Sequence, residues 1–165
     1  MPVDEKIHKC LKEGDKGEQR HKGIRKISAD ENMIAGHIRK AIHNMKAMLF
    51  FKENGFGDWA ISAGFYVLYH LLLALLVKEG FESRNQSCTF ALVEKMIEEG
   101  KISLTKKELE YIYNSEIDLN HSTTVLDLRE RYQYSTQTET EEQEWQEFKS
   151  KIKALFDKIR KDIEG

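Results

Sequence analysis

The sequence predicts an all-α protein, an antiparallel up-and-down bundle of about four to five helices, and three observations lead to this prediction. The 165-residue chain has a single proline, Pro2, so no later proline interrupts a helix. Apolar residues recur at three- and four-residue spacing over several long segments. Short turns that contain glycine separate these segments, and short connections place neighbouring helices antiparallel. No strand is expected.

The chain divides into a basic segment at residues 1–27 and a bundle of helices at residues 28–165. The basic segment is expected to be loosely held, with a short helix around Asp4–Lys12. The 26 Lys and Arg residues nearly balance the 28 Asp and Glu residues, so attraction to nucleic acid must come from a local patch. Cys10 and Cys88 are too few for a disulfide framework and lack the close spacing of a zinc or thioredoxin-type pair.

The first helix of the bundle is expected to start at the capping box Ser28–Glu31 and to end at Asn54–Gly55. Its periodic apolar positions are Ile34, Ile38, Ala41, Met45 and Met48. The second helix is expected to be capped by Asp58 and to end near Gly80. A phenylalanine follows the glycine at the C-terminal end of each of these two helices, in Gly55-Phe56 and Gly80-Phe81, a pattern typical of a left-handed C-terminal cap.

Three further segments complete the bundle. A helix is expected at Gln86–Glu99, and the capping box Thr105–Glu108 opens a segment that runs to about Tyr132. The polar run Asn120–Thr124 predicts a kink or a break inside that segment, because short polar and branched side chains disfavour helix. The last helix is expected to start near Thr138–Glu141.

The stretch Trp59–Val77 is long and apolar enough to raise the question of a membrane span. It contains Ser62 and His70, and its aromatic residues are spread along it instead of gathering at its ends. We therefore expect the central helix of a soluble bundle and no contact with membranes. The N-terminus has no apolar leader segment, so the protein is expected in the cytoplasm.

The sequence has no phosphate-binding loop, dinucleotide fingerprint or nucleophile elbow. His37 and His43 lie six residues apart, which is not the spacing of a helical zinc pair, and no metal or other cofactor is expected. The remaining histidines outside the apolar helix, which likewise lack a ligand at metal-binding spacing, are His8, His21 and His121. His70 is interpreted as a buried imidazole bonded to a backbone or hydroxyl group, with a catalytic role as the alternative.

Arg129, Arg131 and Tyr134 form the most informative polar cluster. Arginines beside phenols at the end of a helix can hold a phosphate through bidentate hydrogen bonds. The alternative is internal pairing, of Arg131 with Asp127 and of Arg129 with Glu130 or another helix. The residue pattern alone leaves both interpretations open.

Two motifs give the chain a family resemblance. The run from Asp58 to His70, followed by Ala74-Leu75-Leu76 and by Lys78–Glu82, resembles the HEPN family (higher eukaryotes and prokaryotes nucleotide-binding). The stretch Leu128–Tyr134 is similar to a second signature of its small prokaryotic branch. The resemblance implies a bundle that is usually a homodimer. It also implies a minimal nucleotidyltransferase as partner, in a toxin–antitoxin or related system.

Many HEPN proteins are metal-independent ribonucleases with an R-x(4–6)-H motif, but neither Arg129 nor Arg131 is followed by histidine at that spacing. The resemblance therefore predicts a non-catalytic or weakly active module that binds nucleotide, RNA or a nucleotidyltransferase through Arg129, Arg131 and Tyr134. One alternative is a divergent ribonuclease in which these three residues act with His70 or His121 as base. The other is a purely structural interaction protein with salt-bridged arginines.

Overall fold

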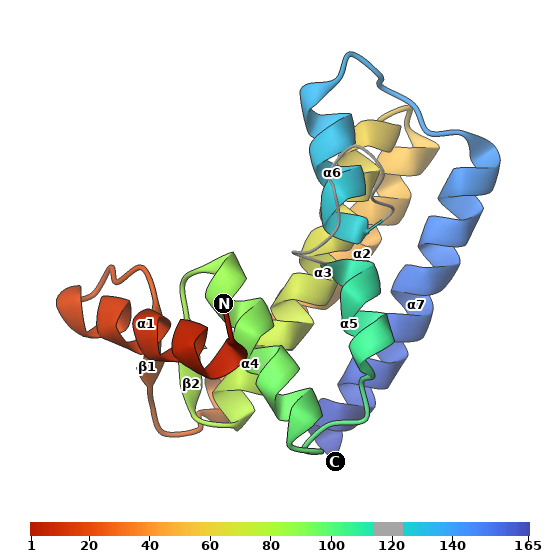
Figure 1. The fold of residues 1–165 in the computed structure, drawn as a ribbon. Coiled ribbons are helices and arrows are strands. Elements are labelled where there is room, and N and C mark those ends of the chain that lie inside the picture. The colour runs from red at the N-terminus through yellow and green to blue at the C-terminus, as the bar shows by residue number, and fades with distance from the viewer. Residues whose placement is uncertain (114–123) are drawn as a thin grey trace.

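The computed structural model describes residues 1–113 and 124–165, and the described chain is dominated by helices (Figure 1). The elements in chain order are α1 (Val3–Lys16), β1 (Ile24–Lys26), α2 (Glu31–Glu53), α3 (Gly57–Lys78), β2 (Phe81–Ser83), α4 (Gln86–Glu98), α5 (Lys106–Ile112), α6 (Val125–Tyr134) and α7 (Glu142–Glu164). The all-α class is confirmed. The described helices outnumber the expected four to five because α1 is a full helix and because α5 and α6 are separate.

Helix α3 is the centre of the bundle, and α2, α6 and α7 pack along it (Figure 1). It is the one described helix that is long and apolar enough to cross a membrane, yet 83% of its most apolar stretch is buried inside the protein. Gly64 shows how closely the helices approach: a Cβ atom there would lie 2.5 Å from the Phe148 ring of α7. The apolar run therefore forms the core of the bundle, as the sequence predicts.

Several local signals act as predicted. Gly55 and Gly80 end their helices with φ of 83° and 87°, in the left-handed region that glycine favours. The capping box formed by Thr105 and Glu108 is present at the start of α5. The kink or break was expected at Asn120–Thr124, and of these residues Thr124 has extended backbone and caps α6, while residues 120–123 lie outside the described chain.

The start of α2 differs from the expectation. Asp30, not Ser28, is the N-cap, and its carboxylate accepts hydrogen bonds from the backbone N–H groups of Asn32 and Met33 at 2.9 and 3.1 Å. A charged carboxylate that accepts two backbone bonds caps a helix more strongly than a hydroxyl two residues earlier. The helix consequently begins at Glu31.

Asp58 does not cap α3, which begins one residue earlier, at Gly57, with Phe56 as a cap that makes no side-chain bond. The Asp58 backbone N–H instead donates to the carbonyl of Thr138 at 3.0 Å. Thr138 thus satisfies a free donor of another helix and does not start α7, which begins at Glu142.

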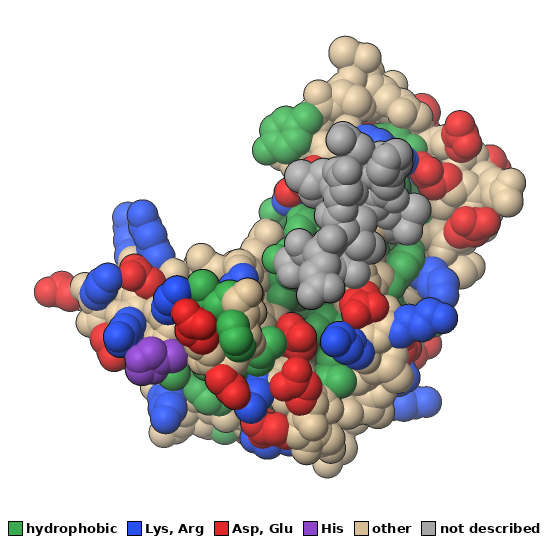
Figure 2. Space-filling model, viewed as in Figure 1, with side chains coloured by type: hydrophobic (Ala, Val, Ile, Leu, Met, Phe, Trp, Pro, Cys, Tyr) green, Lys and Arg blue, Asp and Glu red, His purple; other side chains and the backbone are tan. Residues whose placement is uncertain are grey.

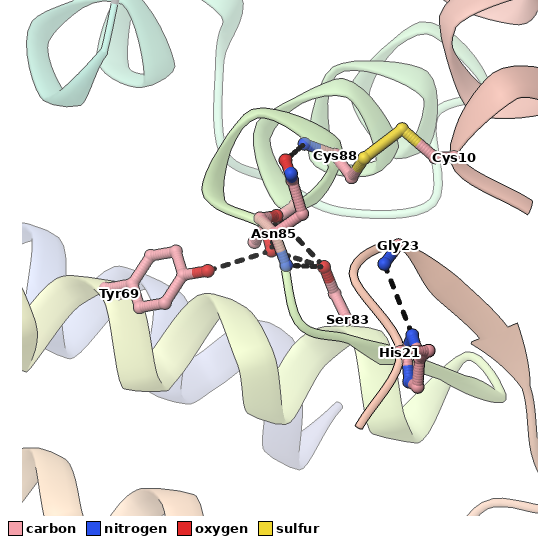
Figure 3. Close-up of a disulfide and its surroundings, with 8 residues drawn as sticks. Cys10, His21, Gly23, Tyr69, Ser83, Asn85 and Cys88 are labelled. Carbon is pink, nitrogen blue, oxygen red and sulfur yellow. Dashed lines mark hydrogen bonds between the residues drawn. A yellow bond between two sulfur atoms is a disulfide. The ribbon is translucent and has the colours of Figure 1, made fainter. Parts of the chain in front are cut away.

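The N-terminal segment is fixed to the bundle rather than loosely held. Helix α1 packs on α4, and β1 pairs antiparallel with β2, with Ile24 opposite Ser83. Cys10 of α1 and Cys88 of α4 form a disulfide across 78 residues (Figure 3). Sequence spacing excludes a close-spaced cysteine pair but cannot exclude a bridge that the fold closes. Strands of three residues carry too short an alternation to be predicted.

Candidate functional site

Arg129 extends from α6 across the aromatic residues of α3. The centre of its guanidinium group lies 4.9 Å from the Phe65 ring centroid and 5.6 Å from that of Tyr66. One terminal nitrogen donates to Gln133 Oε1 at 3.0 Å and to the Tyr66 hydroxyl at 3.5 Å. Only 13% of the side chain is exposed. The two aromatic rings thus hold a planar cation in one orientation through cation–π contacts.

Among the described residues, no carboxylate lies close enough to Arg129 to neutralise its charge. Within the described residues its one ion pair is with Glu130, at the long distance of 4.0 Å. Its Nε atom is buried and has no hydrogen-bond partner in that part of the chain. A desolvated cation without a close counter-ion is costly to bury, and an anion that approaches the guanidinium group offsets this cost. Arg129 is therefore a candidate anion site.

Arg131, by contrast, is engaged in a structural contact. It donates to both carboxylate oxygens of Glu144 on α7, at 3.0 and 3.1 Å, and the hydroxyl of Tyr132 donates to the same carboxylate. Burial and then Glu144 raise the pKa of Tyr132 to about 12. The internal pairing is thus realised for Arg131, but with Glu144 instead of Asp127, which accepts from Thr124 at 2.6 Å. These contacts connect α6 to α7.

Tyr134, the third residue of the predicted cluster, is 81% exposed at the end of α6. Its hydroxyl makes no hydrogen bond to another described residue. The structure therefore separates the cluster into an aromatic-bound Arg129, a salt-bridged Arg131 and a solvent-exposed Tyr134.

His70 pairs with another histidine and not with a backbone or hydroxyl group. Its Nδ1 lies 3.1 Å from Nδ1 of His37 on α2, and the ring centroids are 5.3 Å apart. Burial lowers the pKa of His37 and, together with His37 and Lys40, lowers that of His70 to about 4. Both rings are therefore neutral near pH 7, with one Nδ1–H donating to the other Nδ1. The sequence alone does not show that His37 is the partner of His70, because the two residues lie 33 positions apart on different helices.

The two parts of the site share one face of α3. Tyr66, which contacts Arg129, precedes His70 by four residues and therefore lies one helical turn away on the same side. Tyr69 on the neighbouring side bonds to Thr89 of α4 at 3.1 Å. His121, the other candidate base, lies outside the described residues. Among the described residues, no three His, Cys, Asp or Glu side chains are grouped as metal ligands.

A family model for the HEPN domain matches residues 34–162, which is most of the chain. The chain belongs to the HEPN family. The matched residues include α3 to α6 and nearly all of α2 and α7, and hence Arg129, Tyr66 and both paired histidines. Membership relates the protein to nucleotide- and RNA-associated modules. No curated protein matches the sequence.

Helix α1 and strand β1 precede the residues that the HEPN model matches. The disulfide and the pairing of β1 with β2 therefore join an added N-terminal segment to the HEPN domain.

Proposed function

We propose that this HEPN domain is a non-catalytic module that binds the phosphate of a nucleotide or RNA at Arg129. The observation that supports it is the unneutralised guanidinium group, held by Phe65 and Tyr66 with its closest ion pair 4.0 Å away. The family resemblance adds a nucleotidyltransferase partner in a toxin–antitoxin-like system to the proposal. We expect Arg131 to contribute less than Arg129, because one of its terminal nitrogens is bonded to Glu144, whose carboxylate neutralises its charge.

The chemistry of Arg129 suits a phosphate. A guanidinium group offers two parallel N–H donors that match two phosphate oxygens, and it is charged at every physiological pH. The rings of Phe65 and Tyr66 orient its plane before the ligand arrives, which reduces the ordering cost of binding. The Tyr66 hydroxyl, 3.5 Å from the guanidinium nitrogen, adds a neutral donor beside the same position.

Among the described residues, no histidine or carboxylate is hydrogen-bonded to Arg129, which supports a binding role over catalysis. Its hydrogen-bonding contacts among the described residues are a glutamine and a phenol, Gln133 and Tyr66. A positioned general acid or base contributes about 10²–10⁴-fold in rate, so phosphate binding alone gives little cleavage.

We also propose that the protein is a homodimer. Three large aromatic residues are exposed where α2 turns into α3, with exposed fractions of 60% for Phe50, 51% for Phe56 and 55% for Trp59. Trp59 lies seven residues before Tyr66 and eleven before His70, which puts all three on one side of α3. A second copy packed on this side would cover the aromatic residues next to the candidate site.

The His37–His70 pair favours a second candidate, the divergent metal-independent ribonuclease. A neutral imidazole can accept the proton of a ribose 2′-hydroxyl. The freed oxygen would then attack the phosphorus held by Arg129 and form a 2′,3′-cyclic phosphate, while the 5′-oxygen leaves and takes its proton from the imidazolium. This pair lies one turn of α3 from Tyr66.

Fluorescence anisotropy with a labelled RNA in EDTA tests the proposal. Arg129→Ala should weaken binding about tenfold or more, because a charge-assisted hydrogen bond contributes about 1.5–3 kcal/mol. Arg131→Ala is the charge-matched control and should bind nearly as wild type does, with circular dichroism reporting that both variants are folded. Equal affinities for all three proteins would favour the purely structural interpretation.

The same RNA, resolved on a denaturing gel, separates binding from catalysis. The proposed module leaves the RNA intact. Cleavage by the wild type that disappears in His70→Gln and in Arg129→Ala would establish the ribonuclease instead.

A further inference from the structure

A second surface, outside the HEPN match, is electropositive. Residues 3–26, here called the N-terminal arm, carry eight Lys and Arg residues and five Asp and Glu residues, whereas the rest of the chain carries 18 and 23. The arm consists of α1, the following turn and β1. Figure 2 shows Lys and Arg side chains projecting around the lobe that α1 forms, with acidic side chains between them. The arm thus has the opposite net charge to the domain that carries it.

Helix α1 presents its basic residues on the outer side. Lys9, Lys12 and Lys16 follow one another at spacings of three and four residues, and all three are exposed. Cys10 on the opposite side is buried against the domain. The exposed basic residues of the turn and of β1 are Arg20, Lys22 and Lys26.

Among the described residues, four of these basic side chains form no ion pair with an acidic side chain. Lys9 pairs with Glu5 and Lys16 with Glu13, each within α1. Within the described chain, the basic residues of this surface that form no ion pair are Lys12, Arg20, Lys22 and Lys26. They remain available to an external anion.

The arm is held in place by contacts of three kinds. The Cys10–Cys88 disulfide joins α1 to α4, and β1 pairs with β2 (Figure 3). His21, in the turn, is buried with its Nε2 2.7 Å from the Glu82 carboxylate of β2. A fixed scaffold lowers the entropy that the basic side chains lose when they bind, compared with a mobile tail.

We propose that the N-terminal arm is a second contact surface for RNA, at which Lys12, Arg20, Lys22 and Lys26 contact phosphates. The inference rests on the proposed function only in the choice of RNA as the polyanion. Arg129 lies beside Tyr66, and the arm joins the domain at β2, beyond the C-terminal end of α3. The α3 segment between them rises about 20 Å. A mononucleotide therefore reaches one of the two surfaces, whereas a strand of about 20 nucleotides, at about 3.4 Å each when stacked, can reach both.

The packing of α1 favours RNA over an anionic membrane. A helix that lies on a membrane inserts its apolar side into the lipid. The apolar side of α1 faces the domain, where Ile7 and Leu11 pack against the core and Cys10 is bridged to Cys88. No large apolar side chain is exposed between Val3 and Lys16. The contact that remains is electrostatic, which suits the phosphates of RNA.

The test compares two quadruple variants with the same change of charge. The arm variant replaces Lys12, Arg20, Lys22 and Lys26 by Ala, and the control replaces the exposed residues Lys106, Lys107, Lys153 and Lys161 by Ala. Binding of a 20-nucleotide RNA and of a mononucleotide is measured over a series of salt concentrations. For the arm variant, the slope of log K against log salt should fall by about 0.7 for each lost phosphate contact, while mononucleotide binding is unchanged. The control should keep the slope of the wild type.

The outcomes separate this inference from the proposed function. Equal slopes for the arm variant and the control would overturn the inference, and so would binding of the arm to phosphatidylserine vesicles but not to RNA. If Arg129→Ala binds both ligands as the wild type does, while the arm variant loses only the long RNA, the Arg129 site is wrong and the arm is supported. If Arg129→Ala no longer binds either ligand and the arm variant loses only the binding of the long RNA, both the Arg129 site and the arm surface are supported.

Discussion

The paired imidazoles of His37 and His70 make the bundle sensitive to acid at the scale of single residues. Their hydrogen bond needs one Nδ1 with a proton and one without, so a proton on both rings breaks it. The pKa of His70 is lowered to about 4, mainly by burial, while a histidine of the unfolded chain has a pKa of about 6.5. Between these pH values the unfolded chain binds more protons than the folded protein, which destabilises the fold.

We therefore expect the melting temperature to fall as the pH decreases from about 6.5 to about 4. The double variant His37→Gln/His70→Gln removes both depressed groups, so its melting temperature should vary less over this range. His43→Gln, which changes an exposed histidine on the same helix, is the control and should behave as wild type. Identical pH profiles for the double variant and the wild type would contradict this account.

The residues that could be predicted from sequence are those whose partners are close in the chain. Gly55 and Thr105 act through backbone within their own turns, and both were identified. Arg129 was identified as a site residue, but its contact with Phe65 and Tyr66 on another helix was not. Contacts between helices depend on rotation about each helix axis, which a single sequence does not give.

At the scale of elements, the close approach of α3 to α7 depends on a missing side chain. A Cβ atom at Gly64 would lie 2.5 Å from the Phe148 ring and 3.0 Å from the sulfur of Met48, whereas at Gly36 the nearest side-chain atom is 3.8 Å away, in Arg39. Gly64→Ala should lower the free energy of unfolding by about 1–3 kcal/mol through overpacking. Gly36→Ala should raise it by about 0.5–1 kcal/mol, because alanine loses less entropy in a helix. Urea unfolding followed by circular dichroism measures both, and a similar effect of the two substitutions would refute the packing argument.

The disulfide makes a second prediction for the elements, because it closes a long loop between α1 and α4. A bridge across 78 residues restricts the unfolded chain, and loops of this size contribute about 4 kcal/mol. Reduction, or the variant Cys10→Ser/Cys88→Ser, should lower stability by up to this amount and expose α1 to proteases. In a reducing cytoplasm the two cysteines would be mostly thiols. The N-terminal arm would then be held on the domain without the disulfide, and less firmly.

Melting curves with and without dithiothreitol provide the measurement. The wild type should respond to the reductant and the serine variant should not. A wild-type curve that dithiothreitol leaves unchanged would show that the bridge does not contribute to stability.

The long helices were predictable as elements because each repeats its apolar spacing over several turns. Their first residues were not predictable. Ser28 and Asp30 lie two positions apart and both are residue types that cap helices, and in the structure the Asp30 carboxylate caps α2. At α3, the carbonyl of Thr138 supplies a contact that lies 80 residues away in sequence. The pairing of β1 with β2 depends on the folded bundle in the same way.

At the scale of the whole molecule, charge and apolar surface are divided between two regions. The basic arm lies beyond the C-terminal end of α3, and the exposed aromatic residues lie where α2 turns into its N-terminal end. Large exposed aromatic groups are enriched at protein interfaces, and the fully buried centre of such an interface carries most of the binding energy. Because Trp59 shares one side of α3 with Tyr66, we expect assembly and RNA binding to be coupled.

Phe50→Glu/Trp59→Glu should convert the expected homodimer into a folded monomer, since both side chains are more than half exposed and contribute little to the core. Light scattering after size exclusion gives the mass, and Ala154→Glu, an exposed position on α7, is the control that should remain dimeric. If the second copy completes the Arg129 site, the monomeric variant should also bind RNA more weakly, although Arg129 itself is unchanged. A wild-type mass equal to one 19.3 kDa chain would exclude the dimer. A monomeric variant that binds RNA as tightly as the wild type would instead show that each Arg129 site is complete within one chain.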